Sequence, residues 1–181
     1  MPIAEEIREK NIAGYLIYMW QTEDLIRAFH FNIKTIREHY ISRFSNMSLY
    51  QKEEEEKWFL YLIKLMKEEK LVQKGHLQIN QNIIFELNEL HNKLISCEKY
   101  FPYRTTYYKA LPLIIELREK NEDNSNEIET CFNFLYGIIL LHMQGKRISS
   151  ETEKGKEIIS SYINILAKMY QENKQSPLIF D

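Results

Sequence analysis

Apolar residues recur every three or four positions along almost the whole chain, which is the spacing of helices that bury one face. Between Ile3 and Ala28 this spacing is unbroken and predicts one long helix. Further helices are predicted over residues 33–44, 49–74, 78–100, 104–120, 127–144 and 150–175. Because no useful stretch alternates apolar and polar residues, we predict an all-α fold, a single-domain bundle of about six to seven antiparallel helices. The bundle is expected to occupy residues 1–175, followed by an apolar tail over 176–181.

The expected helix ends rest on capping residues and on glycine. Ser48 with Gln51, and Ser150 with Glu153, have the spacing of a capping box, in which the first side chain accepts a backbone hydrogen bond. Gly75 and Gly145 follow two of the patterns directly, where the left-handed conformation that ends a helix favours glycine. Residues 121–126 form the clearest loop. Pro112 is expected to kink its helix or to mark the true first turn.

Two further features of the pattern carry structural expectations. The segment 127–144 is apolar nearly all round, so we expect a central helix, and Gly137 inside it suggests close approach by a neighbour. The acidic run Glu53–Glu56 is interpreted as a favourable charge at a helix N-terminus. The tail residues Leu178–Phe180 are expected to pack against the bundle or a partner chain.

Size and charge narrow the classes of function. A chain of 181 residues with 44% hydrophobic residues is long enough for one folded domain. Its 24 basic and 26 acidic residues create no positive field for nucleic acid or an anionic membrane. The longest apolar stretch, Cys131–Met143, is too short to cross a bilayer, and the first residues lack the pattern of a secretory signal. We therefore expect a cytoplasmic protein without a membrane partner, in which Cys97 and Cys131 are buried thiols.

A resemblance to a known family covers nearly the whole chain. Its first block is the opening N-I-A-x-Y-L-x-Y-M-W-Q-x-E-D-L-I-R at Asn11–Arg27. Later blocks are Gly75–Gln78, Leu90–His91, Ala110–Arg118 and Leu135–Gly137, in the expected order. These segments resemble an uncharacterised bacterial family of stand-alone cytosolic helical proteins. The resemblance implies a helical fold and no assigned activity, so it assigns no residue a role.

The most suggestive polar cluster lies within the first predicted helix. Gln21, Glu23, Asp24 and Arg27 are hydrogen-bonding side chains in an otherwise apolar segment, and Glu23 falls on the apolar face. Glu23 and Arg27 are one turn apart and have the spacing of an ion pair. Two interpretations stand side by side, a polar pocket that binds a ligand and an ion-pair network that joins helices.

Histidines on apolar faces are the other candidates. His91 and His142 each lie in an apolar stripe, where a hydrogen-bonded core histidine is the favoured interpretation over a general base or ligand. His76 and Glu116 are included as residues that would assist a pocket around Glu23. No histidine has an acidic residue three or four positions away, and no hydrolase or phosphate-loop motif is present. No metal site or cofactor is therefore predicted.

Two hypotheses for the function follow. The leading one is a non-enzymatic helical module that binds another protein or a second copy of itself, supported by the aromatic stretch Tyr100–Tyr108 and by the apolar tail. The alternative is a small-molecule-binding protein or enzyme whose pocket lies around Glu23, Asp24 and Arg27.

Overall fold

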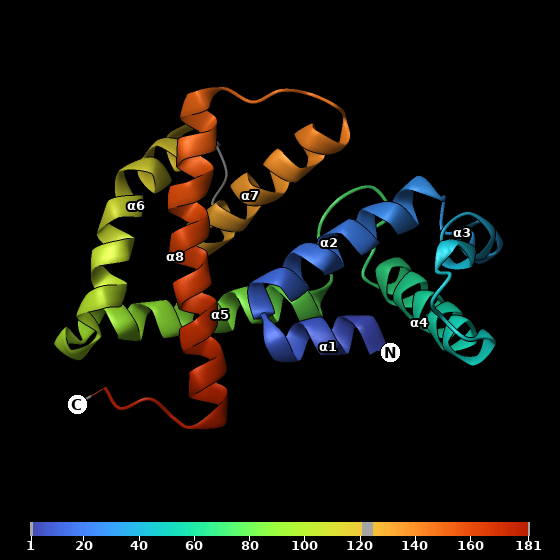
Figure 1. Cartoon of the computed structure of the whole chain (residues 1–181), viewed down its shortest axis with the longest axis horizontal. Coiled ribbons are helices and arrows are strands. Elements are labelled where there is room, and N and C mark those ends of the chain that lie inside the picture. Colours follow the sequence, from blue (N-terminus) through green and yellow to red (C-terminus); the bar gives the residue numbers. More distant parts are fainter. Residues whose placement is uncertain (1, 121–124, 181) are drawn as a thin grey trace. The chain divides into compact units, whose positions relative to one another are not determined.

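The computed structural model describes residues 2–120 and 125–180, and these are almost entirely helical (Figure 1). Their elements are α1 Pro2–Lys10, α2 Ile12–Ala28, α3 Ile33–His39, η1 Ile41–Arg43, α4 Leu49–Glu68, α5 Gln78–Ser96, η2 Glu98–Tyr100, α6 Phe101–Lys120, α7 Glu127–Met143 and α8 Ser150–Gln175. The described residues contain no strand, so the predicted all-α fold is confirmed. Four residues of the expected loop 121–126 lie outside the described residues.

The chain divides into two compact units. The N-terminal unit comprises Met1–Lys10 and Gly14–Asn82, and the C-terminal unit comprises Asn11–Ala13 and Ile83–Asp181. Each unit is described by itself below. The predicted boundary between a bundle over 1–175 and a tail from 176 stays a prediction.

In the N-terminal unit α4 packs against α3 and η1. Asn32 caps α3 by accepting hydrogen bonds from the backbone N–H groups of Lys34 and Thr35. The capping box that begins α4 is formed, because Ser48 and Gln51 each accept from the other's backbone N–H. The buried side chains of this unit come from α2, α3, η1 and α4; they include Leu16, Met19, Trp20, Ile26, Ile36, Ile41, Phe59, Leu62 and Met66.

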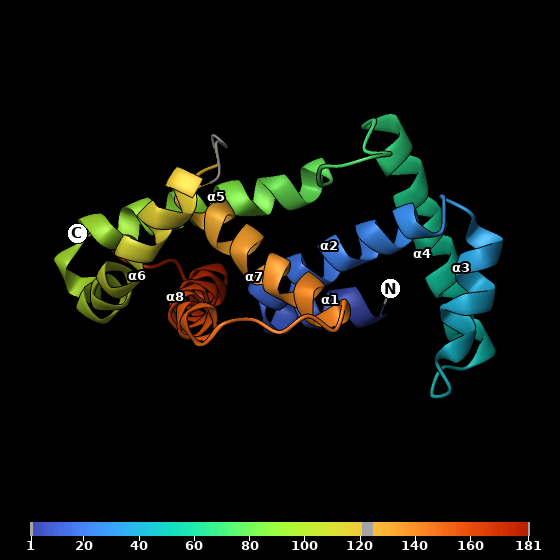
Figure 2. The ribbon, with the colours of Figure 1, turned by 90° about the horizontal axis from the view of Figure 1, so that it is seen from above.

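In the C-terminal unit α6, α7 and α8 contact one another in all three pairs, as Figure 2 shows with α8 seen nearly end-on. Gly155 of α8 makes the close approach. A Cβ there would lie 3.1 Å from Cδ2 of Leu113 on α6. The core of this unit is apolar and aromatic; it includes Leu87, Leu94, Tyr103, Ala110, Ile114, Ile128, Phe132, Ile159, Tyr162 and Leu166.

Several predicted helix ends are wrong, and local backbone chemistry explains them. The helix expected over residues 3–28 is interrupted at Asn11, whose side chain caps α2 by accepting from the N–H of Ala13. The helix expected to run to residue 74 ends at Glu68, where Lys70 adopts the left-handed conformation with φ +59°. The N–H of Leu71 then bonds the carbonyl of Met66, which closes the helix without glycine.

The C-terminal unit contains similar corrections. α6 begins at Phe101, with Pro102 in its first turn where no backbone donor is needed, and it continues through Pro112. The cap of α8 is Ser149, one residue before the predicted Ser150. The explanation offered for Gly137 is wrong, because a Cβ there would meet nothing within 4 Å. The glycine lines an open groove instead.

Candidate functional site

The predicted polar turn of α2 lies inside the N-terminal unit and is centred on Glu23. Its side chain is 0% exposed. Oε1 accepts hydrogen bonds from the backbone N–H of Leu77 at 3.0 Å and from Nδ2 of Asn80 at 2.7 Å. Oε2 lies 2.7 Å from Nδ1 of His76. Both carboxylate oxygens of Glu23 therefore have partners, all supplied by residues 76–80.

These partners place Glu23 at the N-terminus of α5. The carbonyl of Leu77 accepts the first hydrogen bonds of that helix, from Asn80 and Gln81, while its N–H donates to Glu23. A second carboxylate, that of Glu69, accepts from the N–H of Gln78 at 2.8 Å. Negative charge is favourable here because the free N–H groups carry the positive end of the helix dipole. Two carboxylates distant in sequence thus cap α5.

Arg27 fixes the connection between α4 and α5. Its Nε donates to the carbonyl of Leu71 at 3.1 Å, and its Nη2 donates to the carbonyl of Gly75. Nη1 pairs with Asp24 at 2.7 Å. Gly75 has φ +93°, a conformation that permits its carbonyl to turn toward Arg27 and that side chains disfavour. The guanidinium fork therefore clamps two carbonyls of one loop.

Glu23 and His76 form a carboxylate–imidazole pair, which is the arrangement that orients a general base. The His76 ring is one-fifth exposed and stacks on Trp20 with centroids 4.0 Å apart. Stacking and the hydrogen bond together hold the imidazole in one orientation. The contacts of this turn support the interpretation as a network that joins helices, and the pocket around it stays a prediction. Gln21 is half-buried on the same turn.

The other predicted residues lie in the C-terminal unit and do not meet there. Glu116 is exposed on α6 and pairs with Lys120. His142 is exposed near the end of α7, so its interpretation as a core histidine is wrong. His91 alone is buried, at 3% exposure.

His91 is the centre of a second polar network. Its Nδ1 lies 2.7 Å from the hydroxyl of Tyr103 and 2.9 Å from that of Tyr162. Its Nε2 faces Glu127 at 3.8 Å, and Glu127 accepts from the hydroxyl of Tyr107 at 2.9 Å. The network thus joins α5, α6, α7 and α8, as expected of a hydrogen-bonded core histidine.

Burial determines the protonation of this second network. It lowers the pKa of His91 to about 4, so the imidazole is neutral at pH 7 and its Nδ1 accepts a hydrogen bond from a tyrosine hydroxyl. Burial also raises the pKa values of Tyr103 and Tyr162. The thiol of Cys131 is fully buried, and burial raises its pKa as well. These groups are held in their uncharged forms, which suits structural hydrogen bonding better than proton transfer.

Sequence reasoning missed one buried charged residue, Glu55. It is 0% exposed, whereas the acidic run Glu53–Glu56 was interpreted only as favourable charge at a helix N-terminus. The signal was present, because Glu55 lies four residues before Phe59 and seven before Leu62, on the buried stripe of α4.

The described residues give two further results. No three of their His, Cys, Asp or Glu side chains are grouped so that they could hold a metal ion. None of their helices combines the length and the apolar composition needed to cross a membrane.

Comparison with known proteins gives a family and no characterised relative. No curated protein and no solved structure matches the chain. A family model matches residues 1–177. This match confirms the resemblance to an uncharacterised family that the segments from Asn11 onward suggested. The chain therefore belongs to the family described as Domain of unknown function (DUF4924).

Proposed function

We propose that this protein is a non-enzymatic helical module of the bacterial cytoplasm that binds another protein or a second copy of itself. The proposal places the contact on the C-terminal unit, where the apolar tail meets α5. We define the tail groove as the surface lined by Phe85, Glu86, Glu89, Leu90, Lys93, Tyr170, Asn173, Lys174, Pro177, Leu178 and Phe180, with a volume of about 430 Å³.

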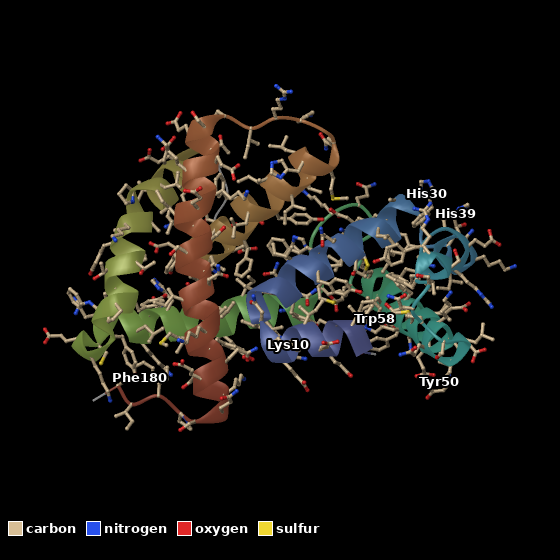
Figure 3. All side chains as sticks on the ribbon, viewed as in Figure 1. Lys10, His30, His39, Tyr50, Trp58 and Phe180 are labelled. Atoms are coloured by element: carbon tan, nitrogen blue, oxygen red, sulfur yellow. The ribbon has the colours of Figure 1, made fainter. Side chains whose placement is uncertain are left out.

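The tail is held on its own unit by specific contacts. The hydroxyl of Tyr100 donates to the carbonyl of Ile179 at 2.9 Å, and its ring lies 5.4 Å from that of Phe180 between centroids. The N–H of Leu178 donates to Oδ1 of Asn173 at 3.0 Å. Figure 3 labels Phe180 beside the end of the chain. The tail therefore has a defined conformation that a partner would recognise.

The observation that carries the proposal is apolar exposure at this docked tail. Phe85, which lines the tail groove, is 63% exposed, and Ile179 is 58% exposed. Large apolar side chains next to a concave surface are typical of protein contact sites, because a partner removes them from water. Glu86, Glu89, Lys93 and Lys174 surround them and supply the polar rim of such a site.

Light scattering across a concentration series tests the proposal, together with pull-down of partners from a lysate. Deletion of residues 176–181 and the Phe85→Ser variant should abolish self-association or remove a bound partner. The matched control is Leu49→Ser, because Leu49 is also exposed but lies in the other unit. If the protein is strictly monomeric and neither change affects partners, the proposal fails.

A further inference from the structure

A small pocket lies in the N-terminal unit where α4 packs against α3 and η1. We define the α3–α4 pocket by the residues that border it: Arg37, Ile41, Leu49, Lys52, Glu53 and Glu56. Figure 3 labels Tyr50, the residue that follows Leu49 at the start of α4. The pocket has a volume of about 150 Å³. Sites for drug-sized ligands start at roughly 300 Å³, so this pocket suits a single small metabolite.

Two cations border the pocket and keep hydrogen-bonding capacity. Nη1 of Arg37 lies 3.3 Å from Oε2 of Glu56, and no hydrogen bond among the described residues accompanies this ion pair. Nζ of Lys52 donates to the carbonyl of Ser42, which also borders the pocket, at 3.3 Å. Both distances are longer than the roughly 2.7 to 2.9 Å of a strong bond from a cation to a carboxylate. A ligand carboxylate could therefore improve on both contacts.

Two carboxylates, those of Glu53 and Glu56, border the same pocket. Lys57 interacts electrostatically with Glu53, but its hydrogen bond goes to Glu54 at 2.7 Å. The pocket thus presents charges of both signs in equal number. A simple anion would be repelled by the two carboxylates, and a simple cation by Arg37 and Lys52. A zwitterion places an opposite charge against each pair.

The rest of the pocket lining is apolar. Ile41 is 1% exposed and supplies a buried wall, whereas Leu49 is 82% exposed although it borders the pocket. An apolar group bound here would remove part of Leu49 from water, which is favourable in proportion to the area covered. The occupant therefore combines two opposite charges with an aliphatic group.

We propose that the α3–α4 pocket binds a free α-amino acid with an aliphatic side chain. Its carboxylate accepts from Arg37, whose planar fork suits a bidentate contact, and from Lys52. Its ammonium donates to Glu53 and Glu56, and its side chain covers Ile41 and Leu49. This function goes beyond the protein contact proposed above, because the tail groove belongs to the C-terminal unit.

The test titrates L-leucine into the full chain at constant ionic strength, followed by two-dimensional NMR of labelled protein and by calorimetry. A Kd on the order of 1 mM is expected, because so small a ligand makes few contacts. Three analogues each lack one feature: N-acetyl-L-leucine the ammonium, L-leucinamide the carboxylate and glycine the side chain. Each should bind at least about tenfold more weakly. The proposal is overturned if L-leucine fails to bind at about 10 mM, or if any analogue matches it.

Two pairs of variants locate the site. Arg37→Gln and Glu53→Gln should each weaken L-leucine about tenfold. Their matched controls remove the same charges outside the pocket lining: Arg43→Gln on η1, and Glu54→Gln, where Glu54 pairs with Lys57. Both controls should keep the wild-type Kd within about twofold, because exposed charges contribute little to stability.

Retention of binding in Arg37→Gln or Glu53→Gln, or its loss in either control, also overturns the proposal. The protein contact at the tail groove is judged separately by light scattering. A failure of L-leucine binding therefore leaves that contact standing, and a strictly monomeric protein that binds L-leucine leaves the pocket standing.

Discussion

Glu23 and Glu55 are both completely buried in the N-terminal unit, yet their surroundings are opposite. Glu23 receives donors from Leu77, Asn80 and His76, and it ties the start of α5 to α2. Glu55 receives no hydrogen bond from the described residues, and burial raises its pKa. The comparison teaches that burial alone does not indicate a site. The hydrogen-bond partners separate a carboxylate that joins helices from one that receives no donor from the described residues.

The largest expected effect is the loss of Glu23. Glu23→Ala leaves the N–H of Leu77 and the amide of Asn80 buried without their acceptor, so the free energy of unfolding should fall by about 3 to 5 kcal/mol. Urea unfolding at pH 7 measures it. Asp24→Ala is the control: the Asp24 side chain is 43% exposed, and its loss should cost less than about 1 kcal/mol. If Glu23→Ala lowers the free energy of unfolding by less than about 1 kcal/mol, Glu23 does not stabilise the fold in this way.

His91 extends the comparison to a buried side chain whose surroundings favour its neutral form. Its folded pKa of about 4 lies below its ordinary value of 6.5, so the unfolded chain binds more protons between these values. The contribution of His91 is therefore fully present above pH 6.5 and is lost as the pH falls toward 4. The loss amounts to about 3 kcal/mol. NMR titration of the imidazole should show a midpoint near 4, whereas a midpoint near 6.5 contradicts the prediction.

Arg27 tests whether the polar turn around Glu23 also binds a ligand. Arg27→Ala removes the donors to Leu71 and Gly75 and should lower the free energy of unfolding by about 2 kcal/mol. Arg27→Lys should restore little of it, because an ammonium lacks the guanidinium fork. A thermal-shift screen of metabolites against both variants completes the test. A metabolite that stabilises only the wild type would support the pocket and oppose a purely structural role.

The smallest expected effect is a gain in stability rather than a loss. Glu55→Met should raise the free energy of unfolding by about 1 to 2 kcal/mol at pH 7, because it removes a buried charge and breaks no hydrogen bond among the described residues. The raised pKa of Glu55 means that its cost appears as the pH rises above its ordinary value of 4.5. The gain should therefore vanish near pH 4. The control, Glu54→Met, should change the free energy of unfolding by less than about 0.5 kcal/mol. If Glu55→Met lowers the free energy of unfolding, the contrast drawn between Glu23 and Glu55 is wrong.

Much of the architecture was predictable from local sequence. Three-and-four spacing identified almost every helix, and Ser48 with Gln51 located the start of α4 correctly. Errors arose at helix ends that glycine and proline do not mark. Lys70 ends α4 in a left-handed conformation, and Asn11 interrupts a continuous apolar pattern with a cap. Neither residue carries the strong signal of glycine or proline.

The candidate sites were less predictable for a different physical reason. Sequence spacing correctly marked Glu23 and Arg27 as unusual, because they stand in an apolar helix, but their partners lie 44 to 57 residues away. The burial of Glu55 was not predicted, because the acidic run was interpreted as a whole, although Phe59 and Leu62 place Glu55 on the buried stripe. Likewise Tyr18 of α2 stacks on Trp58 of α4, two helices that no local pattern connects.

The sequence by itself determined the helical fold, most helix positions and the identity of the polar turn, because these depend on contacts within a few residues. Only the tertiary structure decided that Glu23 has hydrogen-bond partners and that Glu55 has none among the described residues. Desolvation and hydrogen bonding between distant segments set that difference, and both depend on which helix faces pack together. The tertiary structure also exposed His142 and buried His91, two histidines with equivalent local patterns.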